Sequence, residues 1–251
     1  MIDLHTHLLP GVDDGSPSLD HSADVLARLA AEGVGTVVCT PHLRASDAAA
    51  APVEEHTALL AALRSVAPAG MTLTRGFEIA LDVAEPDLAG EGLALGGSRA
   101  RLVEWPRSRV PSAASQVLQH LCDAGVTVVL AHPERYRGLT PDIVAEWRAL
   151  GVVMQGDAIY LLGGGEIGAL ALVMLEHGQL DVLASDNHGD RRGLAAVRSW
   201  LEEIGAAEQA ALLTTENPRR LLADEPLLPV PPLRLAKGFL DRLRSLFRGT
   251  A

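Results

Sequence analysis

The stretch MIDLHTHLLPGVDDG, residues 1–15, opens the chain and carries its strongest pattern. It places His5 and His7 two residues apart at the end of a short apolar run. Because residues i and i+2 of a strand point to the same face, both imidazoles can converge on one metal ion. Asp13 and Asp14 follow in a turn-forming segment, which brings carboxylate oxygens close to these nitrogens. The stretch predicts a strand that ends in a metal site, with a half-buried strand face as the alternative.

Length and composition favour one large domain with a short tail. The chain has 251 residues, of which 48% are hydrophobic, and this suits a single α/β barrel. A net charge of −11 argues against nucleic acid as a partner, because phosphate neutralisation needs clustered cations. The two cysteines, Cys39 and Cys122, lie in apolar surroundings and provide no disulfide framework. We find no secretory signal and no run of about twenty apolar residues, so the sequence predicts a cytoplasmic protein.

Short β-branched runs alternate with longer stretches of helical spacing. The predicted strands are residues 2–7, 36–42, 72–78, 101–105, 126–132, 152–157 and 181–187. The predicted helices are residues 18–32, 54–66, 112–124, 141–150, 164–177 and 193–204. Such alternation is typical of parallel pairing and an α/β fold.

Residues that can bind metal fall at the ends of six of the seven predicted strands. They are His5, His7, His42, Glu78, Glu104, His132, Asp186 and His188. In a parallel barrel all strand carboxyl ends open on one face, where active sites of such barrels lie. The sixth strand ends instead in Gln155 and Asp157, which could line the pocket or form a turn. The joint pattern therefore predicts one pocket built from residues scattered over most of the chain.

The ligand types favour a cluster of two or three ions that hydrolyses a phosphate ester. Histidine and carboxylate donors with little sulfur suit Mn²⁺, Fe or Zn²⁺. Such clusters activate water and stabilise the oxygens of an in-line displacement. Arg135, Arg191 and Arg192 follow strand-end ligands, as does Arg44, and guanidinium groups bind phosphate oxygens bidentately. We therefore predict an arginine clamp beside the metals.

Two other hydrolytic schemes do not match the sequence. Cysteine phosphatases need five residues between Cys and Arg, whereas four separate Cys39 from Arg44. There is no Gly-x-Ser-x-Gly elbow, so a serine nucleophile of the α/β-hydrolase kind is absent from the sequence.

The motifs MIDLHTHLLPGVDDG, TPH, GFEIAL, RLVEWP, AHPERY and SDNH, in this order, resemble the bacterial CpsB/YwqE-type protein-tyrosine phosphatases of the polymerase and histidinol phosphatase (PHP) superfamily. The resemblance runs from residue 1 to about residue 222. It implies a distorted TIM-like (β/α)7 barrel of the PHP fold. It also implies three divalent ions, typically manganese.

The resemblance also implies a ligand set. His5, His7, Glu78 and Asp186 would hold the first ion; Glu78, Glu104 and His132 the second; and Asp14, His42 and His188 the third. Arg135 would hold phosphate together with one arginine after His188, which is either Arg191 or Arg192.

Two features depart from the family pattern near the expected substrate. After TPH this chain reads HLRASDAAAAPVEEH, where the family often has another histidine and a Gly/Tyr/Asn-containing loop. Aromatic residues make up only 3% of the chain. The aromatic candidates near strand ends are Phe77, Trp105, Tyr136 and Tyr160, and the first two also suit a core.

The sequence divides into a metal-dependent phosphatase domain (1–223), a proline-rich linker (224–233) and a basic amphipathic tail (234–251). From residue 231 on, five basic residues and one acidic residue give a charge of +4, against −15 for residues 1–230. Such a tail suits an anionic membrane surface or a partner protein, and packing on its own barrel is the alternative. The oligomeric state is left open.

The leading hypothesis is a protein-tyrosine phosphatase that acts on a membrane-associated bacterial tyrosine kinase of capsule or exopolysaccharide synthesis. The alternative within enzymes is a small-molecule phosphatase of the histidinol-phosphate kind. A PHP-like scaffold without catalysis is a second class, and the complete ligand set argues against it. A nuclease is a third option, against which the acidic barrel argues.

Overall fold

Strands and helices alternate along the chain, as predicted. The computed structural model describes residues 1–106 and 109–234. Its strands are β1 (Ile2–Thr6), β2 (Thr36–Cys39), β3 (His42–Arg44), β4 (Thr72–Arg75), β5 (Glu78–Ala80), β6 (Ala100–Glu104), β7 (Thr127–Ala131), β8 (Val153–Asp157) and β9 (Val182–Ala184). Its α-helices are α1 (Leu19–Ala31), α2 (Val53–Val66), α3 (Ala114–Asp123), α4 (Pro141–Ala149), α5 (Ala158–Leu162), α6 (Gly165–Glu176), α7 (Ala195–Glu203), α8 (Ala207–Ala211) and α9 (Asn217–Leu222). Three 3-10 helices (Ala45–Ala50, Glu91–Leu93 and Pro133–Arg135) and a π-helical turn (Leu212–Glu216) complete the described elements.

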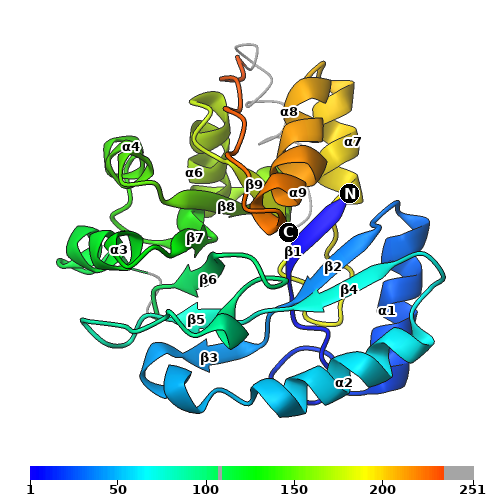
Figure 1. Ribbon diagram of the computed structural model, residues 1–251. Coiled ribbons are helices and arrows are strands. Elements are labelled where there is room, and N and C mark those ends of the chain that lie inside the picture. Colours follow the sequence, from blue (N-terminus) through cyan, green and yellow to red (C-terminus); the bar gives the residue numbers. More distant parts are fainter. Residues whose placement is uncertain (107–108, 235–251) are drawn as a thin grey trace.

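The strands form a distorted barrel of parallel strands, which confirms the predicted fold class. One sheet has the order β1-β2-β4 and the other the order β3-β5-β6-β7-β8-β9. A parallel bridge between Thr6 and Asn187 joins the first strand to the segment after the last strand. The helices lie outside this circuit, with α1 and α2 on one side and α3, α4 and α6 on another (Figure 1). The carboxyl ends of the strands therefore share one face.

Two predicted strands are each broken into two. The stretch 36–42 becomes β2 and β3, and the stretch 72–78 becomes β4 and β5. Pro41 lies at the first break, and its nitrogen has no hydrogen to donate to a neighbouring strand. Hydrogen bonds cross the breaks, from Gly76 N to Cys39 O (2.9 Å) and from Glu78 N to Pro41 O (3.1 Å). After the breaks, β3 and β5 are neighbours in the six-stranded sheet, where His42 pairs with Glu78.

The core follows the alternation of the strand residues. On β7, Val128 and Leu130 pack in a cluster with the apolar face of α3. Val129 and Ala131 belong instead to the barrel interior, where they share a cluster with Leu4 of β1. Both faces of the strand are covered, which explains why its sequence is almost continuously apolar.

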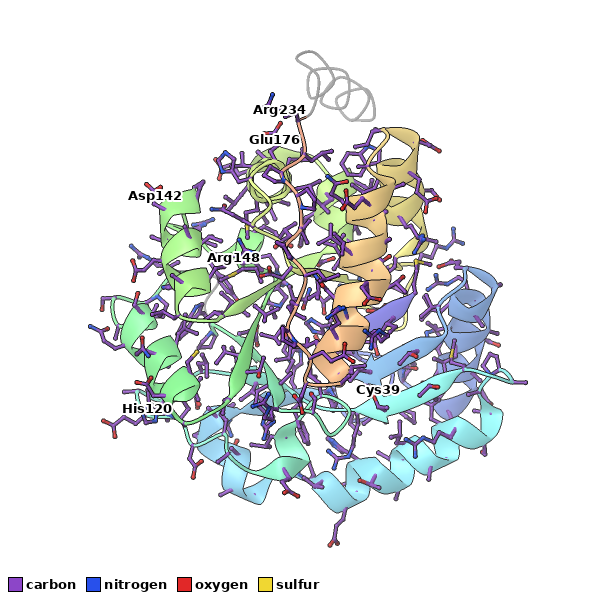
Figure 2. All side chains as sticks on the ribbon, turned by 45° about the horizontal axis from the view of Figure 1, so that its top comes forward. Cys39, His120, Asp142, Arg148, Glu176 and Arg234 are labelled. Atoms are coloured by element: carbon purple, nitrogen blue, oxygen red, sulfur yellow. The ribbon has the colours of Figure 1, made fainter. Side chains whose placement is uncertain are left out.

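The helix ends follow from capping residues. The Ser18 side chain accepts a hydrogen bond from His21 N at the start of α1. Thr140 caps α4 in the same way, and Pro141 occupies the first helical turn, where no N–H partner is needed. Arg148 near the end of α4 pairs with Asp181 at 2.6 Å, and Figure 2 shows this arginine among the side chains beside the sheet. All six predicted helices are present, and their ends differ from the prediction by at most two residues.

Residues 224–234 contain no helix or strand and lie against the barrel. Asn217 and Leu228 exchange two hydrogen bonds of 2.9 Å, and Val230 is buried. The predicted tail, apart from Arg234, lies outside the described residues. Within residues 1–106 and 109–234, none of the helices combines the length and apolar character needed to span a bilayer.

Candidate metal centre

The nine residues predicted as metal ligands lie together on one face of the barrel, although His42 and Glu78 begin β3 and β5 and Asp14 lies in the loop after β1. Their nitrogen and oxygen atoms form four groups, each with all its atoms within 4.8 Å of one another. The groups are His7, Asp14, His42 and His188; His5, Glu78 and His132; His5, His7 and Asp186; and His42, Glu78 and Glu104. The remaining four histidines belong to none of these groups in the described part of the chain.

Glu78, the first residue of β5, lies at the middle of the cluster and is 1% exposed. One carboxylate oxygen lies 2.8 Å from His132 Nε2. The other lies 2.9 Å from His42 Nδ1 and 3.4 Å from both His5 Nε2 and His7 Nε2. Burial favours the neutral acid, but the surrounding histidines outweigh it and hold the pKa of Glu78 well below its ordinary value. This carboxylate therefore contacts four of the clustered histidines at once.

Asp186 connects His5 of β1, and His7 just after it, to two arginines. Its Oδ1 lies 3.2 Å from His5 Nε2 and 3.4 Å from His7 Nε2. Its Oδ2 accepts hydrogen bonds of 3.2 Å from Arg135 Nη1 and Arg192 Nη1. Asp186 has φ +50°, a left-handed conformation that non-glycine residues rarely adopt. This single carboxylate therefore orients ligands on one side and cations on the other.

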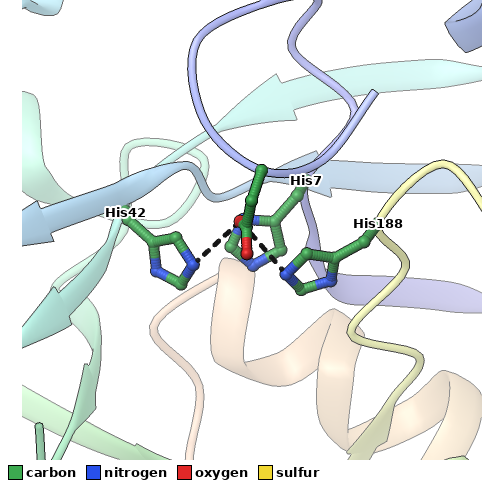
Figure 3. Close-up of side chains that lie close together, drawn as sticks. His7, His42 and His188 are labelled. Carbon is green, nitrogen blue, oxygen red and sulfur yellow. Dashed lines mark ion pairs between the residues drawn. The ribbon is translucent and has the colours of Figure 1, made fainter. Parts of the chain in front are cut away.

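Asp14 lies at the open edge of the cluster. Its Oδ1 is 3.3 Å from His42 Nε2 and 3.5 Å from His188 Nε2, and Figure 3 shows these ion pairs with His7 close by. The rings of His7 and His188 stack with centroids 4.0 Å apart. The Asp14 side chain is 70% exposed, whereas the side chains of His5 and His7 are fully buried. The centre is therefore accessible from the side of Asp14.

The outer nitrogens of several histidines bond to oxygens behind the cluster. His5 Nδ1 lies 2.9 Å from Gln155 Oε1, and His7 Nδ1 lies 2.7 Å from Asp13 Oδ2. His188 Nδ1 lies 2.9 Å from the carbonyl two residues earlier. Because these oxygens accept the Nδ1 hydrogen, Nε2 faces the cluster without a hydrogen and would be the nitrogen that holds a metal ion. The end of β8, which is the sixth predicted strand, therefore supports the centre through Gln155, while Asp157 caps α5.

The residues present fit divalent ions. His5 Nε2 and His7 Nε2 approach to 3.2 Å, a distance at which two protonated rings would repel each other. Burial lowers the pKa of His5, but Glu78 and Asp186 raise it to about 9 in the absence of metal. Burial and the charge of Glu78 raise the pKa of Glu104 to about 7. A cation between these groups would replace such protons, and the N/O donor set suits Mn²⁺, Fe or Zn²⁺.

The structure separates the two neighbouring arginines. Arg192 reaches Asp186, and its Nε also bonds Asp190 Oδ2 at 2.8 Å. Arg191 is exposed and has no such contact with the cluster. Arg44 pairs with Asp47 at 2.8 Å near the surface. In the described part of the chain, Arg135 and Arg192 are thus the two arginines that form ion pairs with a proposed ligand, Asp186.

Three of the four aromatic candidates for substrate contact are buried: Phe77, Trp105 and Tyr136. The Tyr136 hydroxyl donates to Ala131 O at 3.0 Å and accepts from Trp105 N at 3.2 Å. Tyr136 is therefore a support for the end of β7, and only Tyr160 remains partly exposed.

Two buried acids beside the proposed metal ligands were not predicted from the sequence. Asp3 Oδ1 accepts hydrogen bonds from Ser185 N (3.0 Å) and His5 N (3.5 Å), so it joins the first strand to the last. Glu134, also buried, accepts from Asp157 N at 2.7 Å. An acid inside an apolar strand, as in the first four residues, is the signal that could have identified Asp3.

Comparison with known proteins identifies the family. The sequence model described as capsular polysaccharide synthesis, CpsB/CapC, matches residues 1–223. The chain belongs to the CpsB/CapC family. The Staphylococcus aureus protein CapC is 30% identical over 200 residues, covering 75% of this chain and 77% of its own length. The tyrosine-protein phosphatases YwqE of Bacillus subtilis and CpsB of Streptococcus pneumoniae are 27% and 28% identical, covering 92% and 90% of this chain and 95% and 99% of their own lengths.

Solved structures agree with this family. A crystal structure from a study of YwqE and CpsB, described as metal-dependent tyrosine phosphatases, superposes with a TM-score of 0.76 at 26% identity, covering 94% of this chain and 100% of that one. A phosphotriesterase from Mycobacterium tuberculosis superposes with a TM-score of 0.53 at 14% identity, covering 81% of this chain and 84% of its own. The second likeness concerns the barrel fold alone. The predicted CpsB/YwqE resemblance is confirmed.

Proposed function

We propose that this protein is a metal-dependent protein-tyrosine phosphatase. The observation that carries the proposal is the junction at Asp186, where a cluster of histidines and carboxylates meets Arg135 and Arg192. Membership of the CpsB/CapC family supports it, because relatives are named tyrosine-protein phosphatases. Metal ligands and guanidinium groups on one open face suit a phosphate ester.

We propose that the cluster holds three divalent ions, with Mn²⁺ as the first candidate and Fe or Zn²⁺ as alternatives. The sets would be those implied by the resemblance: His5, His7, Glu78 and Asp186; Glu78, Glu104 and His132; Asp14, His42 and His188. His5, His7 and Asp186 of the first set form one of the four groups, and the third set forms another group together with His7. In the second set, His132 Nε2 lies 2.8 Å from Glu78 and 3.9 Å from Glu104, and Glu78 belongs to two sets. When bound, such ions act as Lewis acids and make water a stronger nucleophile at neutral pH.

The arginines bind and orient the phosphate in this proposal. Arg135 and Arg192 both donate to Asp186 Oδ2, so their positions are tied to each other and to the cluster. Guanidinium groups stay charged at any working pH and present further N–H donors to phosphate oxygens. The phosphate would thus lie between the proposed ions and the two guanidinium groups, and both would offset its negative charge.

An aryl ester suits the acids available at the site. Outside the proposed ligands, burial raises the pKa values of three carboxyls near the centre: Asp3, Asp157 (to about 7) and Glu134 (to about 8). All three are almost fully buried, so none of them reaches a leaving oxygen at the open edge. A tyrosyl phenol, with a pKa of about 10, needs less help from an acid than an aliphatic alcohol does.

We propose that the substrate is a phosphotyrosine protein, namely a membrane-associated tyrosine kinase of capsule or exopolysaccharide synthesis. The family description links its members to capsular polysaccharide synthesis. The basic tail predicted from residue 234 on would favour contact with an anionic membrane surface at the cytoplasmic face.

Metal analysis and paired substrates test the proposal. We expect purified protein to contain divalent metal and to hydrolyse a phosphotyrosyl peptide faster than histidinol phosphate. Glu104→Ala and His132→Ala should lower metal content and reduce kcat by at least about a hundredfold, because each removes a proposed ligand. Glu85→Ala and His120→Ala are matched controls, since both residues are exposed and lie outside the four metal groups.

Two outcomes would contradict the proposal. Equal or greater activity on histidinol phosphate would favour the small-molecule phosphatase. A protein that binds no metal and hydrolyses neither substrate would favour the scaffold.

A further inference from the structure

A shallow groove of about 440 Å³ lies next to Arg192. One wall is α5, which directly follows β8, and the other is the segment 190–193 after β9 with the start of α7. Both walls follow the carboxyl ends of strands, so the groove opens on the face that carries the metal centre. Arg192 lines the groove and also donates to Asp186 of the centre.

The floor of the groove is apolar. Ile159, Leu162 and Ala196 contribute to it. Ile159 is 45% exposed and is the most exposed large apolar side chain in the described part of the chain. The other exposed ones, Val66, Val83 and Leu228, do not line this groove. An exposed isoleucine beside a polar centre is therefore available to cover an apolar group of a ligand.

The rim of the groove is positive although the protein is acidic. Arg191 lines the groove, is exposed and forms no ion pair in the described part of the chain. Its neighbour Asp190 is already paired with Arg192 at 2.8 Å, so that carboxylate does not neutralise Arg191. On a chain with a net charge of −11, an unpaired arginine next to a phosphate site favours an acidic partner.

We propose that this groove binds the polypeptide that flanks the phosphotyrosine, with an apolar side chain on Ile159 and an acidic side chain on Arg191. The inference rests on the proposed function and names the substrate as an acidic segment of a protein. A small phosphate ester has no flanking chain and does not reach the groove. Contacts made there raise the affinity for peptides and change how the enzyme discriminates between them.

Binding of peptides that resist hydrolysis tests the groove separately from catalysis. Two peptides carry phosphonomethyl-phenylalanine in place of phosphotyrosine and differ only in flanking Glu or Lys residues. Fluorescence anisotropy with the metal-loaded protein should show tighter binding of the Glu peptide by about fivefold, as befits a partly exposed ion pair. Arg191→Glu should reverse this order. Ile159→Asp should weaken the binding of both peptides by about tenfold through lost apolar contact.

Kinetics provides the second arm. With matching phosphotyrosyl peptides, Arg191→Glu and Ile159→Asp should lower the ratio of kcat/KM for the Glu peptide to kcat/KM for p-nitrophenyl phosphate. Val83→Asp and Arg234→Glu make the same chemical changes at exposed positions away from the groove and should leave this ratio unchanged. Figure 2 shows Arg234 at the outer edge of the molecule.

Failure of the groove and failure of the proposed function look different. Absence of all hydrolysis with a retained Glu preference in binding would reject the phosphatase and keep the groove. Equal binding of the two peptides by the wild type would overturn the groove while leaving the phosphatase intact. If the substitutions changed only the sedimentation coefficient, the groove would be a contact between copies of the chain and the inference would be wrong.

Discussion

Two proposed ligands have backbone conformations that only glycine adopts freely. His132 has φ +35° and Asp186 has φ +50°, and each directly follows the end of a strand or the loop residue after it. Such conformations are unfavourable by about 1–3 kcal/mol each for side chains with a Cβ and persist where contacts hold them. The contact of His132 with Glu78 (2.8 Å) and the two arginines on Asp186 are these contacts. The left-handed backbone conformation directs both side chains away from the strand and into the cluster.

Gly15 lies so close to His7 that no side chain fits between them. A Cβ at this position would lie 2.1 Å from His7 O and 2.4 Å from His7 Cβ. We expect Gly15→Ala to displace His7, to lower metal content and to reduce activity at least about a hundredfold, with overpacking lowering the free energy of unfolding by about 1–3 kcal/mol. Metal analysis and urea denaturation measure these effects. Gly35→Ala is the control, because nothing lies within 4 Å of its added Cβ, and a fully metal-loaded, active Gly15→Ala protein would refute the argument.

Asp157 should make stability depend on pH. Burial, reinforced by Asp186, raises its pKa to about 7 in the folded protein, above the unfolded value of about 3.9. The Asp157 carboxyl therefore makes its full contribution to the free energy of unfolding below about pH 4. This contribution is lost as the pH rises towards 7. Asn at this position does not ionise, and its oxygen can still accept from Ile159 N to cap α5.

The free energy of unfolding of Asp157→Asn relative to wild type should therefore increase between pH 4 and pH 8. The difference in pKa sets a ceiling of about 4 kcal/mol on this increase. Urea denaturation of metal-free protein at several pH values measures it. Parallel curves for the two proteins would show that Asp157 does not titrate in this range.

The sequence predicted the cluster at the level of residues, because metal-binding types recur where strands end. It could not predict how the supporting residues are used. Gln155 lies in a predicted strand and Asp13 in a turn-forming segment, and neither pattern indicates which histidine nitrogen the side chain contacts. The choice between Arg191 and Arg192 also depends on a loop conformation that spacing alone does not determine.

At the scale of elements, the segment from Asn187 to Arg192 is held by a helix from the other end of the chain. Arg28 of α1 donates to Asp190 O (2.8 Å) and Arg192 O (3.2 Å). Asn187 Nδ2 donates to Arg192 O at 2.5 Å. These bonds fix the backbone from which Arg192 reaches Asp186. Arg28 is thus a positioning residue for the proposed phosphate clamp.

Arg28→Ala should lower kcat/KM for a phosphotyrosyl peptide by about tenfold or more, because two charge-assisted bonds to the loop are lost. The same substitution in an Arg192→Ala background should have little further effect, since Arg28 acts through Arg192. Arg64→Ala is the matched control, because Arg64 also donates to a backbone carbonyl, that of Leu73, away from the centre. Additive losses in the double variant would mean that Arg28 supports the fold in general.

The breaks in two strands show where sequence patterns reach their limit. Residues 36–40 favour a strand, and the pattern predicts that this strand continues to His42, whereas Pro41 ends the pairing of β2. Gly76, where a Cβ would lie 2.6 Å from Leu95 Cδ2, marks the second break by close packing with a residue distant in sequence. Contacts of this kind appear only when the chain is folded.

At the scale of the whole molecule, the metal centre spans the closure of the barrel. His5 lies in the first strand and His7 directly follows it, and Asp186 and His188 follow the last strand. Between these strands, Asp3 and the bridge of Thr6 with Asn187 provide direct links. Ions held by residues from both sides would cross-link the barrel where its circuit closes.

Metal should therefore stabilise the entire fold. A ligand at a hundred times its Kd adds about 2.7 kcal/mol per site, which corresponds to a rise in Tm of about 5–10 °C for a chain of this size. Scanning calorimetry of protein with Mn²⁺ and with a chelator measures the rise. The His132→Ala protein should show a smaller one, and an identical Tm with and without metal would exclude a structural contribution of the ions.

The closure of the barrel also has a consequence for synthesis. The ribosome releases His5 and His7 first, and their partners Asp186 and His188 emerge only after almost the entire barrel has been made. A chain that ends before Asp186 thus lacks two of the nine proposed ligands, Asp186 and His188. We expect such a fragment to lack the junction at Asp186 that ties the cluster to Arg135 and Arg192, so the order of residues along the chain protects against active fragments.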